Sequence, residues 1–294
     1  MLSARLSPHP VTKVLPMPPS QPAWNFDGPI LLVGAGKMGH AMLSGWISNG
    51  VPASSLLVQD PHPSDDVASW CEAHSVSLAA SQRPPRAPAV VILAVKPQAM
   101  DEVFPVLAKQ ISVETVTLSI AAGKLIASYE HHLPPMTAVI RAMPNTPAAI
   151  GRGMTVLCAN AHVTQEQRVL SHTLMAAVGE VGWVEDESLM DAVTAVSGSG
   201  PAYVFLLAET LAAAGVKAGL DPVLANQLAR VTIAGAGELM RLSPESAASL
   251  RQNVTSPGGT TAAALDVLMA NAGLGSLMDQ AIAAAVNRSH ALST

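Results

Sequence analysis

Two glycine-rich turns, far apart in the sequence, have the composition of anion-binding sites. The first, Gly34–Gly39, directly follows the apolar run Ile30–Val33, and the second, Ser256–Thr261, opens into the apolar run Ala262–Leu265. A glycine-rich turn that feeds a helix presents unpaired backbone N–H groups and the positive end of the helix dipole. The two turns therefore suggest two anionic ligands, a dinucleotide on the first and a small carboxylate on the second.

The first turn matches the glycine pattern that binds dinucleotides between a strand and a helix. In that pattern Gly34 permits the tight turn, Gly36 allows a pyrophosphate to approach the backbone, and Gly39 allows the helix to pack on the strand. The alternative is an ordinary strand–helix turn without a ligand.

Asp60 stands at the tip of the next predicted strand, residues 55–59. A carboxylate at this position can accept hydrogen bonds from the adenosine ribose hydroxyls, and it would repel a 2′-phosphate. Asp60 therefore favours NAD over NADP. The alternative is that Asp60 caps the helix that follows.

Three more segments end predicted strands at the carboxyl edge of the sheet, where ligands of such sheets bind. Lys96 follows the strand at 90–95, and it is either a ligand contact or a solvated lysine. Ala122 and the loop 143–146 end neighbouring strands, and we expect them to border a nicotinamide.

The last third of the chain contains few candidates for a general base. His290 lies almost at the terminus, and Lys217 precedes a predicted helix stop at Gly219. Oxidation of an alcohol generally needs a positioned base, so the sequence argues against a hydroxy-acid dehydrogenase. Reduction of an imine is less demanding, because the nitrogen can arrive protonated and a hydroxyl can orient it. The second turn offers hydroxyls, or else it is only a capped helix start; the hydroxyls are those of Thr255, Ser256, Thr260 and Thr261.

Strand and helix patterns alternate up to Asp186, which predicts a parallel, doubly wound sheet. Beyond it only helical spacing remains, with many alanines. We therefore predict a disordered Pro-rich leader over 1–26, a Rossmann-type dinucleotide-binding domain over 27–185, and an all-α helical substrate-binding and dimerisation domain over 186–294.

The composition limits the possible partners and compartments. A net charge of −5 with no basic stripe argues against a nucleic-acid partner. Cys71 and Cys158 are isolated, so we expect no disulfide framework and no metal site. No apolar run reaches the roughly 18–20 residues that span a bilayer, and the leader lacks the apolar core of a signal peptide. We therefore expect a cytoplasmic protein without a membrane partner.

Five motifs together resemble the pyrroline-5-carboxylate reductase family. The resemblance runs in order from about residue 29 to residue 292, and the last two motifs are highly specific. The motifs are the glycine turn 34–39, Ala94-Val95-Lys96-Pro97-Gln98, Arg141-Ala142-Met143-Pro144-Asn145-Thr146-Pro147, Ser197-Gly198-Ser199-Gly200-Pro201-Ala202-Tyr203 and the segment Leu250–Thr261.

The resemblance implies reduction of 1-pyrroline-5-carboxylate to L-proline with NADH or NADPH, the last step of proline biosynthesis. It also implies a helical domain that interlocks with a partner subunit, and further assembly into decamers. By position, the substrate contacts would be Ser256, Gly259, Thr260 and Thr261, with the Thr261 hydroxyl near the ring nitrogen. The implied cofactor contacts are Gly36, Lys37, Met38, Ala94, Lys96, Pro97, Ala122 and Asn253.

The chain departs from the family at Asp60, where many members carry a small hydroxyl residue; a carboxylate there favours NADH. Two other functions stay open at this point. One is a sibling reductase of another cyclic imino acid, and the other is a protein that senses dinucleotides without turnover. Oxidation of NADH in the presence of pyrroline-5-carboxylate distinguishes an enzyme from a sensor.

Overall fold

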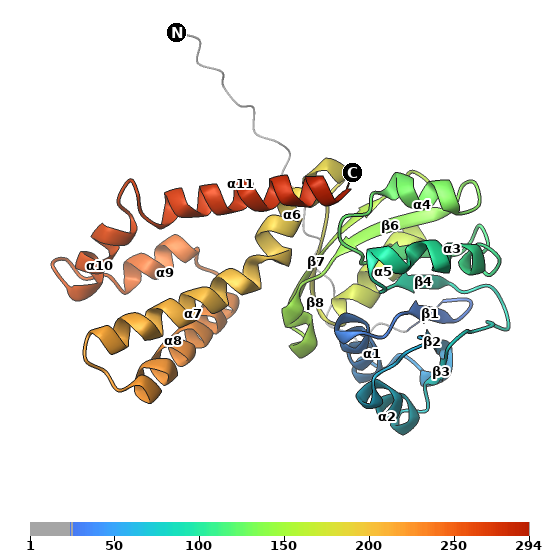
Figure 1. The fold of residues 1–294 in the computed structure, drawn as a ribbon, viewed down its shortest axis with the longest axis horizontal. Helices are drawn as coiled ribbons and strands as arrows, with labels where there is room; N and C mark the ends of the chain where they lie inside the picture. Colours follow the sequence, from blue (N-terminus) through green and yellow to red (C-terminus); the bar gives the residue numbers. More distant parts are fainter. Residues whose placement is uncertain (1–23, 25, 294) are drawn as a thin grey trace, which may run out of the picture. The chain divides into compact units, whose positions relative to one another are not determined.

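Eight strands form one sheet, in the order β3-β2-β1-β4-β5-β6-β7-β8, in the part of the chain that the structure describes (Figure 1). The structure is a computed structural model that describes Trp24 and residues 26–293. The strands are β1 (Ile30–Val33), β2 (Leu56–Gln59), β3 (Ser77–Ala79), β4 (Val90–Leu93), β5 (Val116–Ser119), β6 (Ala138–Met143), β7 (Gly153–Ala159) and β8 (Gly179–Trp183).

The predicted doubly wound topology is confirmed for the first six strands, which are all parallel. The expectation of a wholly parallel sheet is wrong at β7, which runs antiparallel to β6. Parallel neighbours need a crossover of about a dozen residues or more, whereas β6 and β7 are joined by a short loop with one 3₁₀ turn, η3 (Thr146–Ile150). The chain therefore reverses direction at this loop.

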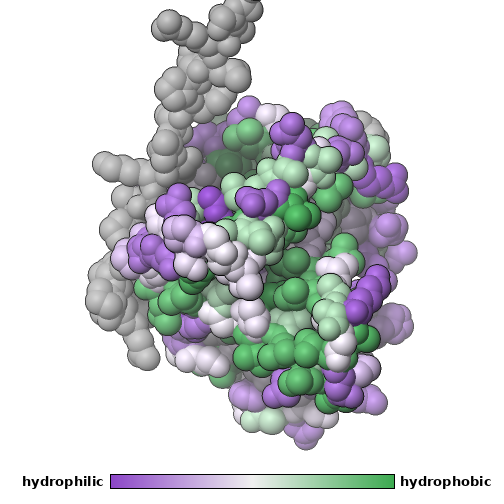
Figure 2. Space-filling model, turned by 90° about the vertical axis from the view of Figure 1, so that its left-hand side faces the viewer, coloured by the Kyte–Doolittle hydropathy of each residue, from purple (hydrophilic) through white to green (hydrophobic). Residues whose placement is uncertain are grey.

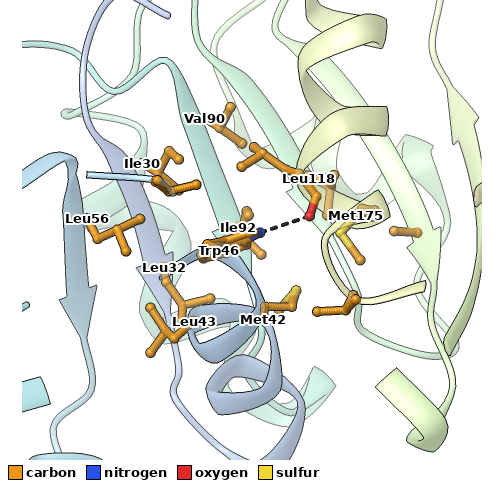
Figure 3. Close-up of a cluster of buried hydrophobic side chains, with 14 of the residues drawn as sticks. Ile30, Leu32, Met42, Leu43, Trp46, Leu56, Val90, Ile92, Leu118 and Met175 are labelled. Atoms are coloured by element: carbon orange, nitrogen blue, oxygen red, sulfur yellow. Dashed lines mark hydrogen bonds between the residues drawn. The ribbon is translucent and has the colours of Figure 1, made fainter. Parts of the chain in front are cut away.

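Alternate residues of each central strand enter two hydrophobic cores, one on each face of the sheet. Ile30 and Leu32 belong to the first core, and Leu31 and Val33 to the second. In the first core the Trp46 indole N–H donates to the Leu174 carbonyl at 2.9 Å (Figure 3). Because helices cover both faces of the sheet, the side chains on both sides of each central strand are buried, and the strands are therefore apolar throughout. The first face is covered by α1 (Lys37–Ser48), α2 (Asp65–Ala73) and α5 (Gln165–Ala176), and the second by α3 (Met100–Leu107) and α4 (Ile126–His132).

Two elements of this sheet layer were not predicted. The strand β3 is an edge strand of three residues, one of them exposed, so it has no apolar run to reveal it. The helix α4 has only seven residues, and its buried side chains are Ile126 and Tyr129. The predicted leader, residues 1–26, lies outside the described residues except at its end, where Trp24 and Phe26 pack against the first core.

Helices alone make up the rest of the described chain, as predicted. The chain divides into two compact units; the second is 195–288, and the last residues from Ser289 belong to the first. The predicted boundary at residue 185 precedes this division. The helices are η4 (Glu187–Leu189), α6 (Met190–Val193), the π-helical turn η5 (Thr194–Gly198), α7 (Gly200–Lys217), α8 (Pro222–Leu242), α9 (Ala247–Asn253), α10 (Thr260–Leu268) and α11 (Leu274–Ser293).

Ser199 is the N-cap of α7, and the elements from η4 to α7 follow one another without a break as one helical stretch. This stretch, Glu187–Lys217, has 31 residues and contains an 18-residue window with a mean hydropathy of 1.3, so among the described residues it has the length and composition of a membrane span. The expectation from the sequence considered only uninterrupted runs of apolar residues, none of which is long enough to span a bilayer. It did not consider a helix in which glycine, serine and threonine separate the apolar residues.

The second unit leaves most of its apolar side chains exposed. Its only buried hydrophobic residues among those described are four alanines, Ala195, Ala212, Ala225 and Ala229. Large apolar side chains such as Phe205 and Val231 are 67% and 66% exposed. Figure 2 shows hydrophobic side chains gathered across the face of the molecule that it displays. Apolar surface on this scale marks an interaction site rather than a solvated face.

Candidate functional site

The strand register brings the predicted ligand positions of the first unit to one edge of the sheet. Val33, at the end of β1, pairs with Gln59 of β2 and with Leu93 of β4. The residues that follow these strand ends are Gly34, Asp60 and Ala94, which therefore lie side by side. The Gly34 N–H donates to the Gln59 carbonyl at 2.8 Å, and the Ala94 N–H donates to the Val33 carbonyl at 2.8 Å.

The three glycines of the turn occupy three different environments. Gly34 has a φ of +91°, and a Cβ there would lie 2.8 Å from the Ala94 carbonyl oxygen. A Cβ on Gly39 would lie 2.5 Å from the Gly34 carbonyl oxygen, so α1 approaches β1 too closely for any side chain. A Cβ on Gly36, by contrast, would meet no atom within 4 Å. The open space thus lies at the glycine predicted to face the pyrophosphate.

The amino terminus of α1 is available to an anion. Gly36 is the N-cap residue, and no side chain accepts from the first N–H groups of the helix in the described structure. Lys37 and Met38 form the first turn, with the Lys37 side chain exposed. Free N–H groups, the helix dipole and a nearby cation fit the phosphates of a dinucleotide.

Asp60 is bound to the backbone of the glycine turn. Its Oδ2 accepts from the Ala35 N–H at 2.8 Å, and its Oδ1 accepts from the His62 N–H at 2.9 Å. The alternative that Asp60 caps the following helix is wrong, because Ser64 is the N-cap of α2 and accepts from the Val67 N–H. A carboxylate has about four acceptor positions, so Asp60 retains capacity for a ribose hydroxyl.

The other predicted contacts of the first unit follow β4 and β5. Lys96 is the N-cap of the short 3₁₀ turn η2 (Pro97–Ala99), which starts with Pro97. Ala122 is exposed at the same edge of the sheet, directly after the buried Ala121, whose N–H donates to the Ser119 hydroxyl at 3.2 Å.

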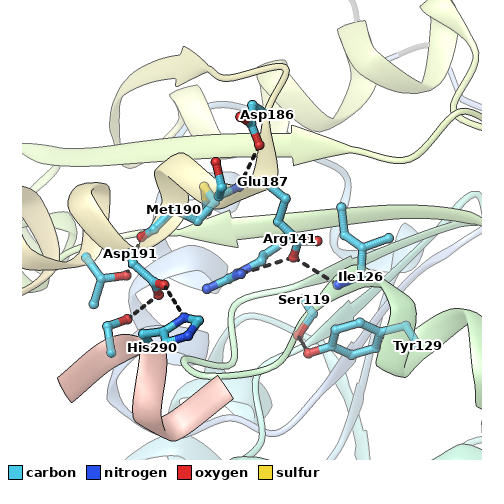
Figure 4. A network of polar contacts seen from close by, with 12 residues as sticks. Ser119, Ile126, Tyr129, Arg141, Asp186, Glu187, Met190, Asp191 and His290 are labelled. Atoms are coloured by element: carbon cyan, nitrogen blue, oxygen red, sulfur yellow. Dashed lines mark hydrogen bonds and ion pairs between the residues drawn. The ribbon is translucent and has the colours of Figure 1, made fainter. Parts of the chain in front are cut away.

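A buried polar network beneath this edge was not predicted (Figure 4). The Arg141 guanidinium on β6, with a side chain 4% exposed, binds the Glu187 carboxylate at 3.0 Å. The same Glu187 oxygen accepts from the Ile126 N–H at 2.9 Å, at the start of α4. Ser119 and Tyr129 share a hydrogen bond of 2.6 Å. Arg141 belongs to a quoted motif, but Glu187 lies 46 residues away, so no local pattern pairs them.

Burial keeps the Tyr129 hydroxyl and the Cys158 thiol, which lie near this network, protonated. Desolvation raises the pKa of the Tyr129 hydroxyl, although the hydrogen bond with Ser119 opposes the shift. Burial, together with the Glu187 charge, raises the pKa of the Cys158 thiol to about 11. These groups are therefore neutral at physiological pH, which fits a structural role.

The second glycine turn lies between α9 and α10, in the second unit. Gly258 has a φ of +70°, and a Cβ on Gly259 would lie 2.6 Å from the Ser256 hydroxyl oxygen. Gly259 is the N-cap of α10, and no side chain caps this helix in the described structure. The alternative of a helix start capped by serine or threonine is therefore wrong. The N–H groups of Thr260 and Thr261 are available to a carboxylate, whereas the Gly259 N–H donates to the Ser256 carbonyl at 3.0 Å.

The hydroxyls of this turn differ in their surroundings. The Thr255 hydroxyl donates to the Arg251 carbonyl at 2.7 Å, so it closes the end of α9. Ser256 and Thr260 are exposed, and Thr261 is half-buried. Asn253, assigned to the cofactor by resemblance, donates through Nδ2 to Glu245 at 2.8 Å. The predicted contacts thus form two groups, one at the sheet edge of the first unit and one at this turn.

Two family models match the chain. The model described as pyrroline-5-carboxylate reductase dimerisation matches residues 187–292, and the model described as coenzyme F420-dependent NADP oxidoreductase matches residues 29–123. A solved pyrroline-5-carboxylate reductase from Coxiella burnetii has a TM-score of 0.83 and 35% identity, and the match covers 91% of this chain and 99% of that one. A Plasmodium falciparum pyrroline carboxylate reductase with NADP bound has a TM-score of 0.76 and 28% identity, over 91% and 99% of the two chains.

Curated relatives match at similar length. The pyrroline-5-carboxylate reductase of Pseudomonas aeruginosa is 42% identical over 261 residues, which cover 88% of this chain and 95% of the relative. That of Mycobacterium tuberculosis is 40% identical over 286 residues, which cover 90% and 96%. The nicotinamide-dinucleotide domain and the helical domain thus occur here in the order and at the length of these relatives, and the chain belongs to the pyrroline-5-carboxylate reductase family.

Proposed function

We propose that this protein reduces 1-pyrroline-5-carboxylate to L-proline with NADH or NADPH, the last step of proline biosynthesis. The observation that carries the proposal is the pair of uncapped helix starts, each preceded by a glycine turn, in a chain of this family. One start suits the pyrophosphate of a dinucleotide, and the other suits the carboxylate of a small imino acid.

The first unit is proposed to hold the cofactor. Backbone N–H groups at Gly36, Lys37 and Met38 would bind the phosphates, and Gly34 and Gly39 shape the turn. Asp60 would accept from the adenosine ribose. Ala94, Lys96, Pro97 and Ala122 would line the remainder at the same sheet edge, and Asn253 is assigned by resemblance alone. When bound, the cofactor supplies a hydride to the imine carbon.

The second unit is proposed to hold the substrate. The N–H groups at Thr260 and Thr261 would bind the carboxylate, with Gly259 and the Ser256 side chain beside them. The Thr261 hydroxyl would donate to or accept from the ring nitrogen as this nitrogen changes from iminium to amine. No general base is required in this direction, because the nitrogen enters with its proton.

The purified protein should oxidise NADH or NADPH when pyrroline-5-carboxylate is added, and it should form proline. We would follow absorbance at the nicotinamide band and measure proline by chromatography. Binding of the dinucleotide without its oxidation would indicate a sensor, and turnover with other cyclic imino acids alone would indicate a sibling reductase. Failure with both cofactors in folded protein would reject the assignment.

We propose that NADH is the preferred cofactor. Asp60 places a negative charge beside the ribose position, and its attachment to the Ala35 and His62 N–H groups fixes that charge in place. Asp60→Ser should therefore raise kcat/KM for NADPH relative to NADH, by about tenfold if one repulsion of about 1.4 kcal/mol is removed. Steady-state kinetics with both cofactors measures the ratio. A clear preference of the wild type for NADPH would contradict this interpretation of Asp60.

The helical unit supports self-association. Its exposed apolar side chains and its four buried alanines leave it without a core of its own, and the dimerisation family model matches it. We propose a dimer that assembles further into decamers, with residues of both subunits near each site. Light scattering should show at least a dimer, and dilution into monomers should abolish activity. An active monomer would contradict this proposal.

The partner subunit, rather than lipid, is the proposed cover for the helical stretch Glu187–Lys217. We further propose a cytoplasmic protein without nucleic-acid or membrane partners, consistent with its net charge of −5. The proposed domain limits are 27–185 and 186–294, close to the start of the dimerisation match at residue 187.

A further inference from the structure

The loop that carries Ala122 is held from two sides by parts of the chain distant in sequence. This loop, residues 120–125, connects β5 to α4 and contains the predicted nicotinamide contact. On one side lies the segment Glu187–Val193, and on the other lies the last turn of the chain, Ser289–Leu292. All of them belong to the first compact unit.

Glu187 fixes the end of the loop. Its carboxylate accepts from the Ile126 N–H at 2.9 Å, where the loop enters α4, and is itself bound to the buried Arg141 at 3.0 Å. Because Arg141 lies on β6, the loop's end is tied to the centre of the sheet.

The last turn of the chain contacts the middle of the loop. Gly123 has a φ of +73°, and a Cβ there would lie 3.0 Å from the Leu292 carbonyl oxygen. The backbone of Leu292 therefore lies against Gly123, directly next to Ala122, and a side chain at Gly123 would push against it.

Asp191 on α6 anchors this last turn. The Ser289 hydroxyl donates to Asp191 Oδ1 at 2.6 Å, and His290 Nδ1 lies 3.6 Å from Asp191 Oδ2 (Figure 4). Ser289 is 6% exposed, and the Asp191 side chain is 16% exposed. A short hydrogen bond to a partly buried carboxylate is among the stronger side-chain contacts of a protein.

We propose that Ser289 and Asp191 are positioning residues, which hold the chain's last turn against Gly123 and so fix the Ala122 loop. The inference rests on the proposed function, because only there does Ala122 border the nicotinamide. Reaction rates are sensitive to such placement, since a displacement of about 1 Å can cost about 100-fold.

The test compares Ser289→Ala with Ser289→Thr, which keeps a hydroxyl, and with Asp191→Asn, which keeps the shape of the acceptor. Ser69→Ala, which removes an exposed hydroxyl from α2, is the matched control. The first measurement is amide hydrogen exchange of peptides covering residues 120–126 in protein without cofactor. The second is steady-state kcat and KM for pyrroline-5-carboxylate.

Ser289→Ala and Asp191→Asn should accelerate exchange in the loop by about 10- to 100-fold, the effect of losing one hydrogen bond to a charged group. Both should lower kcat by about tenfold with little change in KM. Ser289→Thr should retain most of the loop's protection from exchange and most of the kcat, and Ser69→Ala should change neither the loop exchange nor the kcat.

Unchanged loop exchange in both variants would overturn the inference, and so would equal acceleration in peptides of the central strands, which indicates general destabilisation. Loop exchange does not depend on turnover. An inactive wild type with the expected exchange pattern would therefore reject the proposed function while leaving the anchoring by Ser289 intact. An active wild type whose variants keep full kcat would reject this inference alone.

Discussion

Gly36→Val should abolish dinucleotide binding while leaving the fold intact. The Gly36 backbone is extended, with φ −62° and ψ −173°, a conformation that valine adopts readily. A Cβ at this position would meet no atom within 4 Å, so the valine would project into the space that the pyrophosphate needs. Blocking two charge-assisted hydrogen bonds, worth about 1.5 kcal/mol or more each, should raise the Kd for NADH at least about 100-fold.

Calorimetric titration with NADH and NADPH measures this effect, and thermal unfolding monitors the fold. Gly39→Ala is the matched control, because its Cβ would lie 2.5 Å from the Gly34 carbonyl oxygen. Overpacking of this kind costs about 1–3 kcal/mol, so Gly39→Ala should lower the Tm, whereas Gly36→Val should not. Retained NADH affinity in Gly36→Val would show that the cofactor does not use this turn.

The glycine turn was predictable because its signal is local. Four apolar residues form β1, and two of the three glycines that follow, Gly34 and Gly39, are required by close backbone contacts within and beside the turn. The same holds for the start of α10 at Thr260, which follows the second glycine turn. The sequence predicted that Asp60 lies at the end of β2. It did not predict the hydrogen bond from the Ala35 N–H to Asp60, because this bond depends on how β1 and β2 align.

The features that escaped prediction depend on contacts between distant segments. The direction of β7 follows from the length of one connection, which a pattern of apolar residues does not encode. The pairing of Arg141 with Glu187 joins residues 46 positions apart. Similarly, the burial of Ser289 against Asp191 requires the end of the chain to return to the first unit. Sequence periodicity describes which face of a helix is apolar, but not what lies against it.

Thr261→Val should lower turnover strongly while leaving cofactor affinity nearly unchanged. Thr261 lies in the first turn of α10, whose N-cap, Gly259, has no side chain to offer, and no side chain caps this helix in the described structure. If the Thr261 hydroxyl binds the ring nitrogen as it becomes an amine, the bond contributes mainly in the transition state. A lost hydrogen bond to a charged group is worth about 1.5–3 kcal/mol, which corresponds to a kcat about 10- to 150-fold lower.

Thr255→Val separates this role from a structural one within the same turn. The Thr255 hydroxyl is engaged with the Arg251 carbonyl at 2.7 Å, so its loss should lower the Tm and leave kcat close to that of the wild type. Thr261→Val should show the opposite pattern, since valine keeps the shape of threonine and removes only the hydroxyl. If both variants instead lose stability and retain turnover, the hydroxyl of Thr261 serves the helix start and not the substrate. The backbone N–H groups of the turn would then bind the carboxylate alone, and orientation of the imine would have to come from another residue.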